Sequence, residues 1–180
     1  ELGGLVALGT WDVVPITSMP SGANLMSCHF VFAVKRKADG SIEKFKARLV
    51  ADGNTQKHGI DFDRVFATVV KTSTIRLALA EAAAYDYNLS SIDVTQAYLQ
   101  ATLKENLYMR LPPGLPAKPN HVCKLKRSLY GLKQAGREWA LLLASFLVGW
   151  GMDRSTVDVC LYSYRVKHTN TFIRVLIYVD

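Results

Sequence analysis

The pattern of apolar and polar positions predicts a β-hairpin in the first third of the chain. A continuous apolar run, residues 30–34, leads into three bases and then into Asp39-Gly40. Asp-Gly between two strand-like segments is a strong hairpin signal. In the return segment, apolar residues alternate with bases: Phe45, Ala47 and Leu49 against Lys44, Lys46 and Arg48. One face of the hairpin is therefore expected to be apolar and the other cationic.

Helical spacing predicts two helices. We expect Thr72-Ser73-Thr74 to cap a helix that runs from Ile75 to about Tyr85 and is rich in alanine and leucine. A second helix is predicted from about Arg137 to Val148. Its expected core-facing residues, at helical spacing, are Trp139, Leu142, Leu143, Phe146 and Leu147.

Three later apolar segments predict strands. One covers residues 89–94 and carries Asp93 near its end, and the others cover residues 159–164 and 172–179, joined by a polar turn at 167–171. Several prolines between positions 112 and 119 predict a connector. Strands and helices interleaved with a hairpin predict an α+β fold. A chain of 180 residues can build it as one domain or as two small lobes.

Composition is that of a globular protein, with 49% apolar and 21% charged residues. Because the first residue is Glu1, we expect a piece of a longer polypeptide, and we expect no secretory signal before the fold. The longest apolar stretch, residues 139–150, is shorter than the ~20 residues of a membrane span. We therefore expect a buried helix there and no membrane partner.

The net charge of +7 is concentrated in two segments. Residues 31–50 hold six bases against two acids, and residues 121–140 hold five bases against one acid, so each segment carries +4. Concentrated positive charge predicts a polyanionic partner such as a nucleic acid. Two solvated surfaces are the alternative.

The three cysteines are odd in number and scattered, which is typical of reduced thiols: Cys28, Cys123 and Cys160. Zinc is the alternative, because Cys28 is next to His29, and Cys123 is two residues after His121. Neither pair has the two-cysteine spacing of a structural zinc site.

Two carboxylates follow apolar runs. Asp93 ends the first predicted later strand, and Asp180 follows the last one. Taken singly, each aspartate could equally cap the next turn or lie on the surface. Phosphoryl transfer needs carboxylates that bind hard cations and, beside them, basic residues that hold phosphate. Because the chain has both, the two aspartates are candidate metal ligands.

A series of sequence blocks from about Trp11 to the C-terminus carries a more specific signal. The blocks are residues 30–40, 46–51, 59–63, 93–99, 125–135 and 178–180. With them the chain resembles the reverse transcriptase of Ty1/copia-type retrotransposons, the RNA-dependent DNA polymerase domain of a Pol polyprotein. It resembles retroviral reverse transcriptases more distantly. Tyr178-Val179-Asp180 matches the start of the family's Tyr-x-Asp-Asp motif.

The resemblance implies the fingers and palm of a right-hand polymerase, with a ferredoxin-like palm sheet packed on helices and incomplete at the C-terminus. The fingers would cover roughly residues 11–85 and 101–134, and the palm roughly 86–100 and 135–180. The thumb and the RNase H domain would be absent. Because the last motif stops one aspartate short, we expect this piece alone to be inactive.

The implied activity is RNA-directed DNA polymerisation, in which two Mg²⁺ ions, or Mn²⁺ as the alternative, promote transfer of dNTPs to a primer 3′-hydroxyl. Asp93 and Asp180 would be the catalytic metal ligands, with the Val94 carbonyl as a further ligand. The dNTP-binding residues would be Lys46, Arg48, Tyr98, Tyr130, Gly131 and Gln134. Tyr98 would lie under the sugar and exclude a ribose 2′-hydroxyl. Which fingers base contacts the triphosphate is open, because a one-residue register slip exchanges the two hairpin faces.

The implied partners are an RNA or DNA template with its primer, dNTPs and the remainder of the Pol polyprotein. The implied location is intracellular, in a cytoplasmic virus-like particle or the nucleus. The alternative function is a noncatalytic nucleic-acid-binding module or a decayed element copy. Departures from the family pattern, among them His29, Asp52 and Gly136, fit a copy under weak selection.

Overall fold

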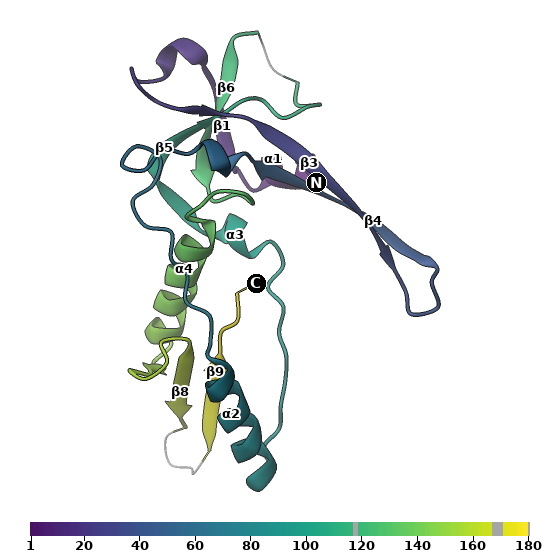
Figure 1. The fold of residues 1–180 in the computed structure, drawn as a ribbon, viewed down its shortest axis with the longest axis vertical. Coiled ribbons are helices and arrows are strands. Elements are labelled where there is room, and N and C mark those ends of the chain that lie inside the picture. Colours follow the sequence, from purple (N-terminus) through teal and green to yellow (C-terminus); the bar gives the residue numbers. More distant parts are fainter. Residues whose placement is uncertain (117–118, 167–170, 180) are drawn as a thin grey trace. The chain divides into compact units, whose positions relative to one another are not determined.

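The computed structural model describes residues 1–180 except 117–118, 167–170 and 180 (Figure 1). It divides into two compact units, Glu1–Val65 with Gln96–Trp139 and Phe66–Thr95 with Ala140–Asp180. Helices and sheets are mixed in it, which confirms the α+β class. The fingers and palm boundaries stay a prediction. Residues 66–85, which that prediction gives to the fingers, belong here to the second unit.

A four-stranded sheet in the order β1-β6-β5-β2 forms the body of the first unit. β1 (Trp11–Pro15), β6 (His121–Arg127) and β5 (Thr102–Met109) are antiparallel neighbours, and β2 (Leu25–Met26) is parallel to β5. The short helical elements of this unit are α1 (Leu2–Ala7), η1 (Ile16–Ser18), η2 (Gly53–Thr55) and α3 (Ala97–Gln100). Its buried core includes Leu5, Trp11, Met26, Leu49, Leu107 and Cys123.

The predicted hairpin is confirmed as β3 (Cys28–Arg36) and β4 (Ile42–Ala51), which project from this unit as a two-stranded ribbon (Figure 1). In the turn, the Asp39 carboxylate accepts hydrogen bonds from the hydroxyl and N–H of Ser41, and these bonds lower its pKa. Lys44, Lys46 and Arg48 share one face of β4 as predicted, and the register adds Lys35, which pairs with Lys44. The other face is apolar but buried only near the base of the hairpin, because Phe32 and Phe45 are 75% and 78% exposed.

The second unit is built on a three-stranded antiparallel sheet of β7 (Asp153–Arg154), β8 (Leu161–Arg165) and β9 (Phe172–Leu176). The predicted turn at 167–171 falls mainly outside the described residues. α2 (Thr72–Ala84) lies beside β9, and Glu81 forms an ion pair with Arg174 (Figure 1). α4 (Ala135–Gly149) begins in the first unit and continues in the second. The core of the second unit contains Val70, Ala144, Leu147, Met152, Cys160, Tyr162 and Ile177.

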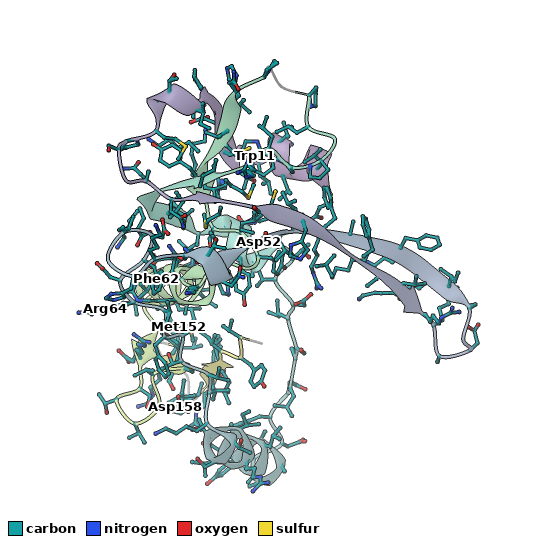
Figure 2. The ribbon with its side chains drawn as sticks, turned by 45° about the horizontal axis from the view of Figure 1, so that its top comes forward. Trp11, Asp52, Phe62, Arg64, Met152 and Asp158 are labelled. Atoms are coloured by element: carbon teal, nitrogen blue, oxygen red, sulfur yellow. The ribbon has the colours of Figure 1, made fainter. Side chains whose placement is uncertain are left out.

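The start of α2 is held by a residue from far along the chain, so the prediction of a local cap by Thr72-Ser73-Thr74 is wrong. The helix begins at Thr72, and its N-cap residue, Lys71, makes no side-chain cap. Instead, the Asp158 carboxylate accepts hydrogen bonds from the Lys71 N–H at 2.9 Å and the Thr74 hydroxyl at 2.6 Å (Figure 2). A carboxylate at this position also complements the positive end of the helix dipole.

The predicted buried face of the second helix is partly wrong. Trp139 and Leu147 are buried, but Leu142 and Phe146 are 39% and 57% exposed. The prediction rested on helical spacing alone, which does not show where one core ends and another begins. Because α4 passes from one unit into the other, each core takes only a short part of its surface.

The predicted strand at residues 89–94 is also wrong. The segment is irregular, and Leu89 and Ile92 are 66% and 87% exposed. A strand needs a neighbour for its N–H and C=O groups, and among the described residues β9 pairs only with β8. In the same described part of the chain, no helix is long and apolar enough to cross a membrane.

Candidate active site

Three of the predicted nucleotide-binding side chains form one cluster in the first unit. The guanidinium carbon of Arg48 lies 5.3 Å from the centroid of the Tyr130 ring. The Tyr98 ring meets the Tyr130 ring edge to face, with centroids 5.1 Å apart. All three side chains are half-buried and come from β4, from the loop after β6 and from α3. A partly exposed guanidinium can bind an anionic ligand such as a phosphate group.

Tyr98 is carried by a short helix that is anchored on both sides. The chain enters α3 through Gln96 in a left-handed conformation, with φ of +54°. Leu99 is fully buried in the core. At the other end, the Arg127 guanidinium donates hydrogen bonds to the carbonyls of Leu99 and Gln100, which are carbonyls that a helix end leaves unpaired. These contacts fix the side of α3 from which the Tyr98 ring projects.

Gly131, a predicted nucleotide-binding residue, approaches the backbone of another segment of the protein closely. Its φ is +89°, and a Cβ there would lie 2.0 Å from the carbonyl oxygen of Ala51. Gly53 faces it, since a Cβ at Gly53 would lie 2.0 Å from the Gly131 carbonyl oxygen. The Ala51 N–H donates a 2.8 Å hydrogen bond to the Tyr130 carbonyl. Tyr130 is therefore tied to the end of the strand that carries Arg48.

Gln134, another predicted nucleotide contact, has no exposed side-chain surface. Its Oε1 accepts a hydrogen bond from Gln56 at 2.9 Å, and its Nε2 donates to the Asp61 carbonyl at 2.8 Å. Sequence reasoning gave no role to Gln56 or to Asp61, although Asp61 lies in the matched block 59–63. The two residues are 5% and 2% exposed. A nucleotide contact by Gln134 stays a prediction.

The remaining predicted residues are distributed between the units. Lys46 is half-buried on β4, on the same face as Arg48. Asp93 and Val94 lie in the exposed irregular segment of the second unit, and Asp180 lies outside the described residues. Within the described residues, no group of three or more histidine, cysteine or acidic side chains gathers to hold a metal. The metal-binding roles of Asp93, Val94 and Asp180 therefore stay predictions.

The cysteines are free, and burial raises the pKa of two of them. The pKa of Cys28 is about 11, raised by burial and then by the nearby Asp52 charge, and that of Cys123 is about 12, raised by burial and then by Cys28. His29 does not pair with a thiol. Its Nδ1 lies 2.7 Å from a carboxylate oxygen of Asp52, at the base of the hairpin (Figure 2). Two departures from the family pattern thus contact each other.

Comparison with known proteins shows the family to which the chain belongs. The family model described as "Reverse transcriptase (RNA-dependent DNA polymerase)" matches residues 9–180. The chain is 38% identical over 182 residues to the "Retrovirus-related Pol polyprotein from transposon RE1" of Arabidopsis thaliana, a match that covers 100% of the chain and 12% of that protein. It is 40% identical over 182 residues to the corresponding polyprotein from transposon TNT 1-94 of Nicotiana tabacum, covering 100% of the chain and 13% of the relative.

A more distant relative is the Transposon Ty1-MR1 Gag-Pol polyprotein of Saccharomyces cerevisiae, 31% identical over 173 residues, with 90% of the chain and 10% of the relative covered. The chain thus spans only 10 to 13% of the length of these curated relatives. No solved structure matches it significantly. Because the family match covers residues 9–180 and the relatives are retrotransposon polyproteins, the chain belongs to the reverse transcriptase family of nucleotidyltransferases, among the Ty1/copia-type Pol polyproteins.

Proposed function

We propose that this chain is the nucleotide-binding part, fingers and palm, of an RNA-directed DNA polymerase that extends a primer with dNTPs. The observation that carries the proposal is the Arg48–Tyr130–Tyr98 cluster, within a chain whose residues 9–180 match the reverse transcriptase family. The partners that follow are a template with its primer and the remainder of a Pol polyprotein. The proposed location is a cytoplasmic virus-like particle or the nucleus.

Arg48 is the proposed triphosphate ligand. A guanidinium presents a planar fork of N–H donors that matches two phosphate oxygens at once. The guanidinium carbon lies over the Tyr130 ring, and the Arg48 side chain stays partly exposed. Lys46 lies on the same face of β4 and adds positive charge along the path of the phosphates. This placement favours Arg48 and Lys46 as the fingers bases that contact the triphosphate.

Tyr98 is the proposed gate against ribonucleotides. Its ring is held edge to face against Tyr130, and α3 is fixed by the burial of Leu99. A ring held rigidly beneath the sugar excludes a ribose 2′-hydroxyl by steric clash, whereas a mobile ring would move aside. The contact with Tyr130 therefore supports selection for deoxynucleotides.

The residues present fit a magnesium site in their chemistry. Asp93 and Asp180 supply carboxylate oxygens and Val94 a backbone carbonyl, which are the hard oxygen donors that Mg²⁺ prefers. Asp93 lies in an exposed segment, where its carboxylate is accessible to a cation. When bound, the metal supplies charge neutralisation and activation of the attacking hydroxyl.

The test is primer extension by the reverse transcriptase region that contains this chain, on an RNA template with Mg²⁺. Asp93→Asn is expected to abolish extension, and Asp153→Asn, an exposed acid on β7, is expected to leave it unchanged. A folded protein that binds primer–template but never extends it would favour the second candidate, a noncatalytic nucleic-acid-binding module. The concentration of a net +7 charge in two segments supports that candidate, and its binding would weaken steeply with salt.

A further inference from the structure

We propose that Gln134 and Gln56 are positioning residues. Their buried amide pair fixes Tyr130 against Arg48, and Gln134 acts through this pair instead of through contact with the nucleotide. This inference rests on the proposed function, because Arg48 and Tyr130 are the groups that it positions.

The first observation is that the pair uses its amide groups inside the protein. Gln56 Nε2 donates to Gln134 Oε1 at 2.9 Å, and Gln134 Nε2 donates to the Asp61 carbonyl at 2.8 Å. Gln56 Oε1 accepts a 2.7 Å hydrogen bond from the Lys133 N–H. A nucleotide contact by Gln134 would require these buried bonds to break and leave unsatisfied polar groups behind, which is costly.

The second observation is that hydrogen bonds hold the backbone on both sides of Tyr130, and that the glutamine pair supplies one of them. The Ala51 N–H holds the Tyr130 carbonyl on one side, and Gln56 holds the Lys133 N–H on the other. Between these bonds, the facing glycines at positions 53 and 131 bring the two backbones into direct contact. The backbone of Tyr130 therefore has little freedom to shift relative to β4, which carries Arg48.

Asp61, which accepts the hydrogen bond from Gln134, is itself held in place by hydrogen bonds. The Asp61 side chain is 2% exposed, and its Oδ2 accepts hydrogen bonds of 2.8 Å from the Asn24 amide and from the Lys57 N–H. The Asp61 carbonyl that receives Gln134 is thus held in place from two directions. A fixed acceptor at one end and a fixed donor at the other match the Gln134 amide, whose nitrogen donates while its oxygen accepts.

The experiment compares Gln134→Met with wild type in the full reverse transcriptase. Methionine keeps the volume and removes both hydrogen bonds. We expect KM to rise about tenfold, equally for all four dNTPs, with kcat little changed, since small misplacements of binding groups cost up to about 100-fold. Discrimination against ribonucleotides should also fall, because Tyr130 supports Tyr98. The control is Asn106→Met, which replaces an amide that is exposed on β5 and lies outside the proposed site.

A double substitution separates positioning from direct contact. On an Arg48→Met background, Gln134→Met should add no further rise in KM, because it acts through the Arg48–Tyr130 contact. An additive rise, or a rise that depends on the base of the dNTP, overturns the proposal. If Gln134→Met gives no cooperative thermal transition, Gln56→Asn, which shortens the amide, carries the same test.

Loss of folding in both variants also overturns the proposal, because the pair would then be a structural requirement only. Failure of the proposed function and failure of this inference can be told apart. An inactive wild-type enzyme contradicts the proposed function, whereas an active wild type with an unchanged KM in Gln134→Met contradicts only this inference.

Discussion

The guanidinium carbon of Arg48 lies 5.3 Å from the centre of the Tyr130 ring, although one residue comes from β4 and the other from the loop after β6. The distance is set by backbone contacts, since the Tyr130 carbonyl accepts a hydrogen bond from Ala51 near the end of the same strand. The orientation of the proposed triphosphate ligand therefore depends on a loop that is remote in the sequence.

Replacement of Arg48 tests this relationship. Arg48→Lys keeps the charge but loses the planar fork and its packing on the ring, and contacts of this kind contribute about 0.5–1 kcal/mol at exposed sites. We expect KM for dNTPs to rise two- to fivefold, about the equivalent of that energy, and to rise further in Arg48→Met. Steady-state primer extension measures both, with Arg76→Lys on the exposed side of α2 as the control. A wild-type KM in Arg48→Met would rule out the assignment.

Tyr98 offers a test of sugar selection. Tyr98→Ala removes the ring and should increase ribonucleotide incorporation relative to deoxynucleotide by about tenfold or more, because the steric clash with the 2′-hydroxyl is lost. Tyr98→Phe keeps the ring and its edge-to-face contact with Tyr130, so discrimination should be retained. Competition between a dNTP and its matching rNTP measures the ratio. Equal ratios in the alanine and phenylalanine variants would show that this ring does not act as a gate.

Alanine substitutions at two glycines with nearly the same backbone conformation can distinguish the effects of conformational strain and steric clash on stability. Gly40 has φ of +85° with open space around its Cβ position, whereas Gly131 has φ of +89° and the Ala51 carbonyl oxygen 2.0 Å from that position. Gly40→Ala should lower the free energy of unfolding by about 1–2 kcal/mol, the cost of a left-handed alanine. Gly131→Ala should lower it by more than about 4 kcal/mol. Urea unfolding measures both, and equal losses would contradict the close approach.

Asp158 predicts a pH dependence of stability. Burial raises the pKa of its carboxyl group, but hydrogen bonds from Thr74, Lys71 and Cys160 outweigh burial, and the pKa lies below its ordinary value. The folded state therefore binds fewer protons than the unfolded state in the acid range. The stabilisation is fully present above the unfolded pKa of about 4 and is lost as pH falls through the lower folded value.

Asp158→Asn should accordingly lose about 1.5–3 kcal/mol near neutral pH, the range for hydrogen bonds to charged groups, and should show a weaker acid dependence. Urea unfolding from pH 7 down to pH 2.5 is the measurement. A residual slope is expected from Asp39, whose pKa is also lowered. Asp153→Asn on β7 is the control, and identical pH profiles in wild type and Asp158→Asn would contradict the account.

Local sequence patterns were sufficient to predict those elements whose stabilising contacts are also local. The hairpin follows from Asp39-Gly40 and from the alternation around Lys46, and the structure confirms both. The cap of α2 could not be predicted, because its acceptor is Asp158. The strand predicted at 89–94 failed for a related reason, since an apolar segment becomes a strand only where another strand pairs with it.

The candidate site was predictable as a set of residues but not as an arrangement. Family resemblance selected Arg48, Tyr98 and Tyr130 one by one, and only the fold shows that their side chains touch. Gln56 gave no signal, because polar residues in an irregular loop are ordinarily solvated. Asp61 lies in the matched block 59–63, but no role was assigned to it. Two glutamines that bury their amides against each other become recognisable only once the loops lie side by side.

The facing glycines at positions 53 and 131 also bear on the history of the element. Neither position accepts a Cβ without displacing the opposite backbone, and most single-nucleotide changes in the first two positions of a glycine codon introduce one. Copies that are still selected for polymerisation should keep both codons, whereas copies released from selection should lose them at the neutral rate. Sequencing these two codons across the copies in one genome would therefore distinguish lineages that still transpose from those already in decay.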